Sequence, residues 1–304
     1  MPKNFWEIII NNGWEKYFFS ESDLPEQEVE ILIIRTKTRF SQKMLDHYPR
    51  LKMIIRAGSG YDNIDIDAVR KKDVIVCSTP EANKTAAFEH TISLIMALLK
   101  RHNQAQRAIS DSTWKDNLQP CWEFSEIRAL IVGLGRIGTM VAETLQILGA
   151  QVRGVDPYLN DDEMLAKGVR KIDYQQGLCW CNLISFHCPL TLETVGYFNS
   201  ASLKSLNDPV WLINAARGGI ISKEIYQDPL YDKYILGIGL DVYEKEPCSI
   251  SDLPQKQNII YTPHIAAFTR PARMKLVTET LKTWESYVFH NEVYGEIDYR
   301  FTYK

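Results

Sequence analysis

The feature that most constrains this chain is a glycine-rich turn near its middle. The apolar stretch 129–132 (Ala-Leu-Ile-Val) runs directly into Gly-Leu-Gly-Arg-Ile-Gly at 133–138, and Asp156 ends the next apolar stretch. This order predicts a buried strand, a tight turn, the start of a helix, and a second strand that ends at an acid. A chain with this pattern folds as an α/β domain around a parallel sheet.

The glycines and the acid each have a physical task. Gly133 permits the tight turn, Gly135 lets the backbone approach a pyrophosphate, and Gly138 lets the helix pack closely on the strand. The helix N-terminus adds N–H donors and a positive dipole. Asp156 accepts hydrogen bonds from a ribose 2′-OH and repels a 2′-phosphate, which favours NAD over NADP. The sequence therefore predicts an NAD site that includes Gly133, Gly135, Arg136, Ile137, Gly138 and Asp156.

The rest of the chain alternates between strand and helix patterns. Short apolar runs at 8–10, 29–34, 52–55 and 74–77 are separated by helical patterns such as 41–48 and 65–72, and a long helical stretch follows at 83–109. Further strands are predicted at 151–155, 183–187, 210–214, 235–241 and 258–261, before a last helix at about 271–287. Alternation of this kind indicates parallel sheets covered by helices.

The length indicates two domains, because 304 residues exceed one ordinary α/β core. We predict an α/β fold of two doubly wound parallel-sheet domains. A Rossmann NAD-binding domain at 103–270 is inserted into a flavodoxin-like substrate domain made of 1–102 and 271–304. The stretch 91–99 is apolar on nearly every helical face, so we expect it to be buried between domains or between subunits.

Composition narrows the class of protein. A net charge of −3 gives no reason to expect nucleic acid or an anionic membrane as a partner. The chain has no apolar run long enough for a transmembrane helix and no signal-peptide pattern, so we expect a cytoplasmic protein. Cys179 and Cys181 resemble a metal-binding pair, but no second pair or histidine cluster follows. We expect small buried thiols there and no metal site.

Four polar patches fall at the ends of predicted strands or in the loops after them, at 56–63, 214–219, 241–247 and 262–267. In open α/β sheets, ligands bind just outside the carboxyl ends of the strands. Taken alone, Arg217 is explained as a helix cap, Glu246 as solvated surface and His264 as a structural histidine. Taken together, each follows a separate strand of the nucleotide-binding domain, so we expect them to converge on a nicotinamide ring.

Such a set of side chains suits the reduction of a 2-keto acid. An arginine supplies a planar fork of donors for the carboxylate. A histidine supplies the proton that the carbonyl oxygen takes up. A neighbouring carboxylate orients the histidine and favours its charged form. We therefore predict Arg217, His264 and Glu246 in these three roles.

The motifs resemble, in order and spacing, those of the D-isomer-specific 2-hydroxyacid dehydrogenases from about residue 29 to residue 285. The matching segments are Arg-Ala-Gly-Ser-Gly-Tyr-Asp-Asn-Ile-Asp at 56–65, Ser-Thr-Pro at 78–80, Phe-Glu-His-Thr at 88–91, His-Cys-Pro-Leu-Thr-Leu-Glu-Thr at 187–194, Leu-Ile-Asn-Ala-Ala-Arg-Gly at 212–218, Asp-Val-Tyr-Glu-Lys-Glu-Pro at 241–247 and Thr-Pro-His at 262–264. The resemblance implies NAD-dependent interconversion of a 2-keto acid and a D-2-hydroxy acid. An arginine before the Ala-Gly-Ser-Gly loop is closer to the phosphoglycerate-type members than to the lactate-type ones.

The resemblance also implies roles for single residues. The amides of Ser59 and Gly60, with Arg217, hold the substrate carboxylate. His264 donates the proton and Glu246 pairs with it. Asp241 contacts the nicotinamide carboxamide. Cofactor contacts are implied at Thr79, His187, Cys188, Pro189, Thr194, Ala215, Ala216, Arg217, Asp241, His264 and Ala266.

Two features of the chain bear on its partners. The stretch 114–127 departs from the Gly-Xaa-Glu-Leu-Xaa-Gly-Lys-Thr pattern of the family, in a loop that often lies at a dimer interface. We expect a homodimer whose interface details stay open, and a small-molecule substrate. The chain ends soon after the last predicted helix, so we expect no regulatory domain and no amino-acid feedback of the kind such domains provide.

Several alternatives stay open at this point. A non-enzymatic NAD(H)-sensing protein shares the fold, as in transcriptional corepressors, although such proteins usually add terminal regions for partners. Arg56 either forms a salt bridge with Asp62 or Asp65, or faces a second anionic group on the substrate. His187 and Cys188 also fit a buried strand end.

His90, on the long helix, is more simply explained as a structural residue than as a ligand-binding one. The chemistry predicted above does not require it.

Overall fold

The chain forms two compact units. The computed structural model describes residues 27–299 except 37, 117, 255 and 257. The first unit combines Met1–Thr85 with Ala267–Lys304, and the second unit is the continuous segment Ala86–Ala266. The domain bounds expected from the sequence, with the NAD-binding domain at 103–270, stay a prediction. The expected strand at 8–10 lies outside the described residues.

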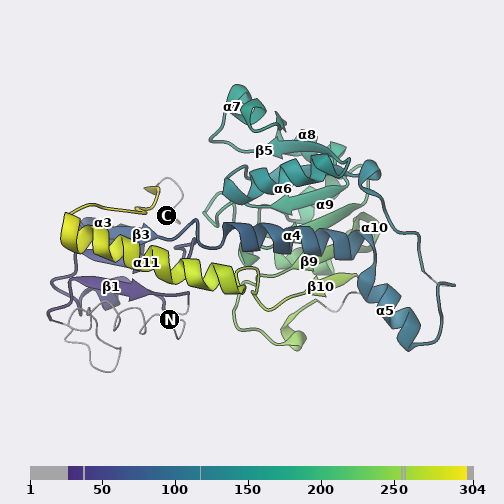
Figure 1. The fold of residues 1–304 in the computed structure, drawn as a ribbon. Helices are drawn as coiled ribbons and strands as arrows, with labels where there is room; N and C mark the ends of the chain where they lie inside the picture. Colours follow the sequence, from purple (N-terminus) through teal and green to yellow (C-terminus); the bar gives the residue numbers. More distant parts are fainter. Residues whose placement is uncertain (1–26, 37, 117, 255, 257, 300–304) are drawn as a thin grey trace. The chain divides into compact units, whose positions relative to one another are not determined.

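The first unit holds a three-stranded parallel sheet in the order β1-β2-β3. Figure 1 labels its strands β1 and β3. One face is packed by Leu45, Ile66 and Val69 from the helices that follow β1 and β2, and the other by Trp284 of the last helix. Alternate residues of each strand serve the two faces, which explains why the strands read as continuous apolar runs. The elements are β1 (Ile31–Ile34), α2 (Gln42–Leu45), β2 (Met53–Arg56), α3 (Ile66–Lys71), β3 (Ile75–Ser78) and α11 (Arg270–His290).

The second unit is built on a seven-stranded parallel sheet in the order β10-β9-β8-β7-β4-β5-β6. Its helices are α4 (Lys84–Leu99), α5 (His102–Ser110), α6 (Arg136–Ile147), α7 (Asp161–Ala166), α8 (Tyr174–Trp180), α9 (Ser200–Lys204) and α10 (Tyr231–Tyr234). Its strands are β4 (Arg128–Val132), β5 (Gln151–Val155), β6 (Arg170–Lys171), β7 (Leu183–Phe186), β8 (Val210–Asn214), β9 (Ile235–Leu240) and β10 (Ile259–Tyr261). Among the described residues, short 3₁₀ helices occur at Phe124–Glu126, Gly218–Ile220, Lys223–Gln227 and Ile250–Asp252.

The strand order reverses direction between β4 and β7. From β4 the chain first moves outward through β5 and β6, then returns to the other side of β4 and continues through β7, β8, β9 and β10. A doubly wound sheet binds its ligand at this switch point, outside the carboxyl ends of the strands. The glycine-rich turn follows β4, so the topology places it at the switch point.

Alternation along the strands of the second unit separates two cores. Leu130, Ile184 and Leu212 pack on one face, in a core that α8, α9 and α10 complete. Ile131 and Ile213 point to the other face, where α4 and α6 cover the sheet. The predicted strands at 151–155 and 210–214 are confirmed without change, and the other predicted strands of this unit end within a residue or two of the observed ones.

The long helical stretch predicted at 83–109 is two helices. α4 ends at Leu99 and α5 begins at His102, because Arg101 adopts a left-handed backbone with φ of 51°. Leu94, Ile95 and Leu99 of α4 belong to the core of the second unit, which explains why this helix is so apolar. The sheet of the second unit covers one face of the helix, and its burial between domains or between subunits stays a prediction.

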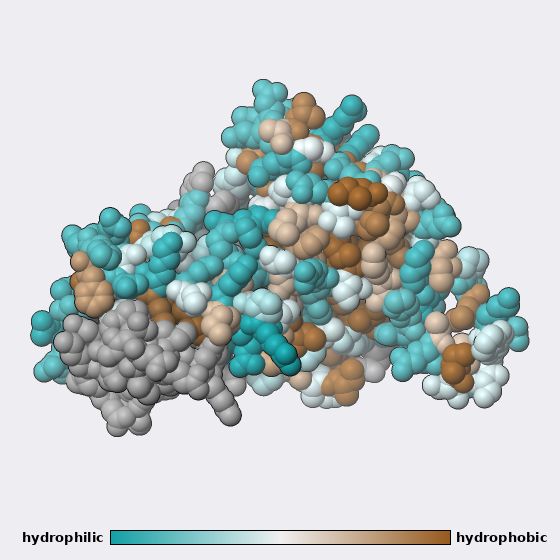
Figure 2. Space-filling model, in the orientation of Figure 1, coloured by the Kyte–Doolittle hydropathy of each residue, from teal (hydrophilic) through white to brown (hydrophobic). Residues whose placement is uncertain are grey.

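The surface carries apolar residues in small groups separated by polar ones, on the face that Figure 2 shows. Large exposed apolar side chains include Ile147 and Leu165. None of the helices in the described part of the chain combines the length and apolarity that a bilayer crossing requires. Cys181 is buried, as expected, but Cys179 is exposed and directs its thiol to the carbonyl of Ser205.

Candidate cofactor and active site

The glycine-rich turn has the shape that its glycines predict. Gly133 has a φ of +91°, and a Cβ there would lie 2.8 Å from the backbone of His187 and Cys188. A Cβ on Gly138 would lie 2.0 Å from the carbonyl oxygen of Gly133. These two glycines are required by the close approach of backbone to backbone. The backbone of the turn between β4 and α6 can therefore adopt this conformation only if both positions are glycine.

Gly135 is different, because open space surrounds it. A Cβ there would meet no atom within 4 Å. Gly135 is also the N-cap of α6, and no side chain caps that helix end. An open helix N-terminus with its N–H groups and positive dipole fits the pyrophosphate of a dinucleotide.

Asp156 lies directly after β5 and is held by two backbone amides. Oδ2 accepts from the amide of Leu134 at 2.9 Å, and Oδ1 accepts from the amide of Tyr158 at 3.0 Å. The carboxylate is thereby fixed next to the glycine-rich turn. Each carboxylate oxygen has more than one lone pair, so both can still accept from a ribose hydroxyl. The residues present fit an NAD molecule.

The residues of the loop after β7 form hydrogen bonds within the loop and with the neighbouring strands. His187 donates its amide to Val132, and its Nε2 lies 2.8 Å from Ser185 Oγ. Burial lowers the pKa of His187 to about 4 and raises that of Cys188 to about 12, so both side chains are neutral. Both residues are partly buried, and their contacts with a cofactor stay a prediction. Thr194 Oγ1 donates to the carbonyl of Pro189 at 2.6 Å and closes the loop.

The loop after β8 carries Arg217. Asn214, which is fully buried, donates to the carbonyl of Arg217 at 2.8 Å and accepts from the amide of Ala216 at 3.1 Å. A Cβ on Gly218 would lie 2.0 Å from the backbone of Tyr243, so this loop packs directly against the loop after β9. The backbone that presents Arg217 is therefore fixed on both sides.

The loops after β9 and β10 bring Glu246 and His264 together. His264 Nδ1 lies 2.6 Å from Glu246 Oε2, and Glu246 Oε1 accepts from the amide of Tyr243 at 3.0 Å. Burial opposes ionisation of Glu246, but the bonds from His264 and Tyr243 and the positive charge of Arg217 outweigh it. The pKa of Glu246 therefore lies below its ordinary value. The His264 side chain is 37% exposed, so its other ring nitrogen can meet a ligand.

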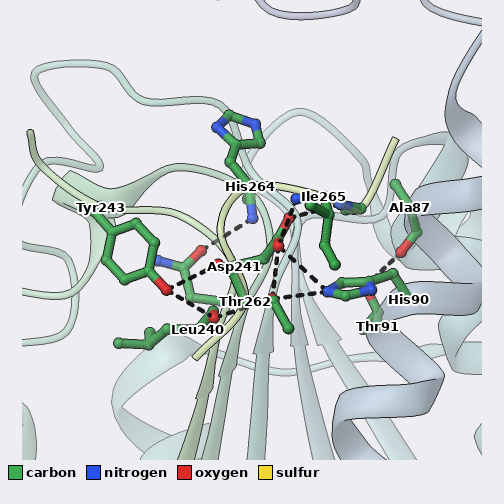
Figure 3. A network of polar contacts seen from close by, with 12 residues as sticks. Ala87, His90, Thr91, Leu240, Asp241, Tyr243, Thr262, His264 and Ile265 are labelled. Atoms are coloured by element: carbon green, nitrogen blue, oxygen red, sulfur yellow. Dashed lines mark hydrogen bonds and ion pairs between the residues drawn. The ribbon is translucent and has the colours of Figure 1, made fainter. Parts of the chain in front are cut away.

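His264 itself has an unusual backbone. Its φ is 53°, a left-handed conformation that costs a residue with a Cβ roughly 1–2 kcal/mol. Asp241, fully buried, holds the chain immediately after it: Oδ1 accepts from the amide of Ile265 at 2.8 Å and Oδ2 from that of Ala266 at 2.9 Å. The hydroxyl of Tyr243 donates to the carbonyl of Thr262 on the other side (Figure 3). The surrounding hydrogen bonds stabilise the conformation that presents His264.

The remaining predicted residues of the second unit fall on the same loops. Arg136 and Ile137 open α6, and Ala215 and Ala216 lie between β8 and Arg217. Arg217, Glu246 and His264 thus come from the carboxyl ends of three neighbouring strands, β8, β9 and β10. In the described part of the chain, no group of three or more His, Cys, Asp or Glu side chains is placed to hold a metal ion.

In the first unit, the loop after β2 holds the other predicted substrate residues. The amide of Gly58 donates to Thr79 Oγ1 at 2.8 Å, and the amide of Thr79 donates to the carbonyl of Gly58 at 3.0 Å. Thr79 thus fixes the loop to the end of β3. Among the described residues, the amides of Ser59 and Gly60 have no hydrogen-bond partner, so both remain available to an anion.

Arg56 lies across this loop. Its Nη1 donates to the carbonyl of Ala57 at 3.2 Å and its Nη2 to Thr36 Oγ1 at 3.0 Å, while the side chain is buried. A Cβ on Gly58, whose φ is +141°, would meet the guanidinium at 1.5 Å. Arg56 and Gly58 therefore depend on each other for their conformations.

Sequence reasoning gave no individual role to four residues that build the site. Asn214, Tyr243 and Thr262 stand inside the recognised motifs, but their bonds reach across loops that spacing does not relate. His90 stands on α4, far from the loops in sequence, and its Nε2 lies 3.0 Å from Thr262 Oγ1. Its place in the Phe-Glu-His-Thr motif at 88–91 is the one sequence signal for it.

Known proteins resemble this chain in sequence. The model of the NAD-binding domain of the D-isomer specific 2-hydroxyacid dehydrogenases matches residues 92–266. The D-3-phosphoglycerate dehydrogenase of Archaeoglobus fulgidus is 31% identical over 91% of this chain and 52% of its own length. That of Bacillus subtilis is 33% identical over 92% of this chain and 52% of its own length. The chain spans about half the length of the curated relatives it matches.

Solved structures resemble the whole fold. The D-lactate dehydrogenase from Aquifex aeolicus, complexed with NAD and lactic acid, has a TM-score of 0.85 at 25% identity and covers 98% of each chain. An acyclic imino acid reductase in complex with NADPH and D-Arg has a TM-score of 0.81 at 25% identity, covering 98% of this chain and 96% of its own. The α/β fold with a Rossmann NAD-binding domain is thus confirmed.

Proposed function

The chain belongs to the D-isomer specific 2-hydroxyacid dehydrogenase family, and we propose that it interconverts a 2-keto acid and a D-2-hydroxy acid with NAD(H). The observation that carries the proposal is the contact of 2.6 Å between His264 and Glu246 at the ends of two strands, with the positive charge of Arg217 acting on Glu246. This arrangement combines a proton donor, a group that stabilises the charged donor, and an arginine for a carboxylate.

The glycine-rich turn and Asp156 would hold the cofactor. The α6 N-terminus offers N–H donors to a pyrophosphate beside Gly135, and Asp156 accepts from the ribose hydroxyls. A 2′-phosphate would place negative charge against the Asp156 carboxylate, so we infer a preference for NADH over NADPH. When bound, NADH supplies the hydride that reduces the carbonyl carbon.

The protein supplies position and the proton. The planar guanidinium of Arg217 binds the substrate carboxylate through two donors. His264, with Glu246 beside it, donates a proton to the carbonyl oxygen as negative charge develops there. In the oxidative direction, neutral His264 removes the proton from the hydroxyl group. Glu246 remains ionised in both directions because its pKa is lowered.

The first unit contributes to substrate selection in this proposal. The available amides of Ser59 and Gly60 suit an anionic group of the substrate. In this proposal, the role of Arg56 decides which kind of side chain the substrate carries. The bonds of Arg56 to Ala57 and Thr36 support a structural role in holding the loop. The relatives are named D-3-phosphoglycerate dehydrogenases, and for that reason a phosphorylated keto acid is the first substrate to test.

The test is turnover by the purified protein. NADH consumption is measured with a panel of 2-keto acids that carry neutral, carboxylated or phosphorylated side chains, and the product's configuration is determined by chiral chromatography. We expect consumption with at least one keto acid and a D product. Tight NADH binding without turnover on the panel would instead support a non-enzymatic NAD(H)-sensing protein.

The proposal extends to the state of the protein in the cell. We propose a homodimer in the cytoplasm that binds neither nucleic acid nor membranes, consistent with a net charge of −3. Light scattering of the purified chain measures the mass. A monomer mass at all concentrations would contradict the dimer.

A further inference from the structure

His90 is a titratable residue beside the site that the proposed mechanism does not use. It lies in α4, and its side chain is 16% exposed. Its Nε2 lies 3.0 Å from Thr262 Oγ1 and 3.4 Å from Asp241 Oδ1. Figure 3 shows the ring pointing from the helix toward the loops after β9 and β10. One polar side chain of α4 is thus directed at the loop that carries His264.

The geometry fixes which atom carries the proton. Thr262 Oγ1 lies 2.6 Å from Asp241 Oδ1, a distance at which the hydroxyl donates to the carboxylate. With its only proton directed to Asp241, the hydroxyl can only accept from His90. Nε2 of His90 is therefore the protonated nitrogen, and a directed chain of hydrogen bonds runs from His90 through Thr262 to Asp241.

This chain ends on the carboxylate that orders the proton donor's loop. Asp241 is fully buried and accepts the amides of Ile265 and Ala266. Burial opposes its ionisation, but the bonds from His90, Thr262 and the two amides outweigh it, and its pKa is lowered. A buried carboxylate keeps one orientation only while its hydrogen-bond partners are complete.

We propose that His90 is a positioning residue, which holds Thr262 and Asp241 in the orientation that keeps His264 in its left-handed, proton-donating conformation. The effect on turnover rests on the proposed function. The effect on the loop does not, because it follows from the hydrogen bonds alone. His90 needs no contact with substrate or cofactor for this role.

Three variants of the full chain test the proposal. His90→Leu removes the Nε2 donor, and His90→Gln places an amide N–H near the position of Nε2. The matched control is Thr91→Val, because Thr91 is equally a polar residue of α4, fully buried, whose hydroxyl bonds only within its helix, to the carbonyl of Ala87 at 2.8 Å. The control measures what the loss of any polar group from this helix does.

The first readout is hydrogen–deuterium exchange of the peptide that covers 262–266, with no ligand added. His90→Leu should speed exchange of the Ile265 and Ala266 amides by about tenfold or more, the equivalent of one hydrogen bond to a charged group. His90→Gln and Thr91→Val should exchange there as the unaltered protein does. Unchanged exchange in His90→Leu, or equal acceleration in all three variants, would overturn the proposal.

The second readout is steady-state turnover. His90→Leu should lower kcat for keto-acid reduction by at least about tenfold with little change in NADH affinity, and His90→Gln should recover most of it. If the unaltered protein turns over no keto acid, the proposed function fails while the exchange experiment still decides the role of His90. If turnover is normal in His90→Leu while the amides of the loop exchange faster, the order of the loop does not affect proton donation by His264. That result would refute the positioning role.

Discussion

Two loops at the same edge of the second unit's sheet are built by opposite means. The glycine-rich turn after β4 has its shape because side chains are absent: Gly133 and Gly138 allow backbone to touch backbone. The loop after β10 has its shape because side chains are present, and it keeps His264 at a φ of 53° through bonds to Asp241 and Tyr243. The first loop shapes a space for a ligand, and the second orients a reacting group.

Because the two loops are built differently, substitutions in them should impair different properties of the protein. Changes in the glycine-rich turn should weaken cofactor binding or stability. Changes in the loop after β10 should lower the rate while cofactor binding persists. Four predictions, ordered by the size of the expected effect, test this difference and the roles of the neighbouring Glu246 and Asp156.

The largest effect is expected from the proton donor. His264→Asn removes the acid and keeps a polar side chain, so kcat/KM for keto-acid reduction should fall about 10²–10⁴-fold. NADH affinity, measured by fluorescence titration, should stay close to that of the unaltered protein. A parallel loss of affinity would mean that the two loops are not functionally separate.

The next effect concerns Gly138 and Gly135, which form a matched pair. Gly138→Ala forces a Cβ to within 2.0 Å of a backbone carbonyl, and overpacking of this kind costs about 1–3 kcal/mol in the free energy of unfolding. Gly135→Ala meets no atom within 4 Å, so stability should hold while NADH affinity falls. Thermal unfolding and NADH titration of both variants measure this, and equal stability losses would contradict it.

Glu246→Gln should move the pH dependence of the reaction. The ionised carboxylate favours charged His264, so removing its charge favours the neutral ring. The rate of reduction should then decline at a lower pH in the variant than in the unaltered protein. The lowered pKa of Glu246 keeps it ionised across the profile of the unaltered protein. A profile in the variant that superimposes on the original would remove Glu246 from the proton relay.

The smallest change is expected at Asp156. Asp156→Ser removes the charge that repels a 2′-phosphate, so the ratio of kcat/KM for NADH to that for NADPH should narrow. The loss of the bond from Leu134 should weaken both cofactors slightly. Equal use of NADH and NADPH by the unaltered protein would refute the role assigned to Asp156.

The same contrast explains how much could be predicted from the sequence. A glycine in such a motif indicates a position where the backbone tolerates no side chain. The order of residues alone therefore placed the turn with Gly133 and Gly138 between a strand and a helix. The strands at 151–155 and 210–214 were predictable because apolar and β-branched runs report burial. Arg217, Glu246 and His264 could be grouped because parallel strands end at one edge of a sheet.

The parts that could not be predicted depend on contacts between distant segments. No Gly or Pro marks the break between α4 and α5 at Arg101, and the helical pattern of the sequence continues through it. The bonds from Asn214 to Arg217 and from His90 to Thr262 join side chains whose spacing in the sequence carries no signal. Where the first unit ends depends on which core α4 joins, and that is decided by packing against the β-sheet rather than by composition.

The central claim is that this edge of the sheet performs proton-coupled reduction rather than merely binding NADH. The most direct test mixes stoichiometric NADH-bound protein with an excess of the best keto acid in a stopped-flow instrument. The unaltered protein should consume its bound NADH in a single turnover, and His264→Asn, loaded equally, should consume it at least about a hundredfold more slowly. Equal rates in the two proteins, or no consumption by either, would contradict the account.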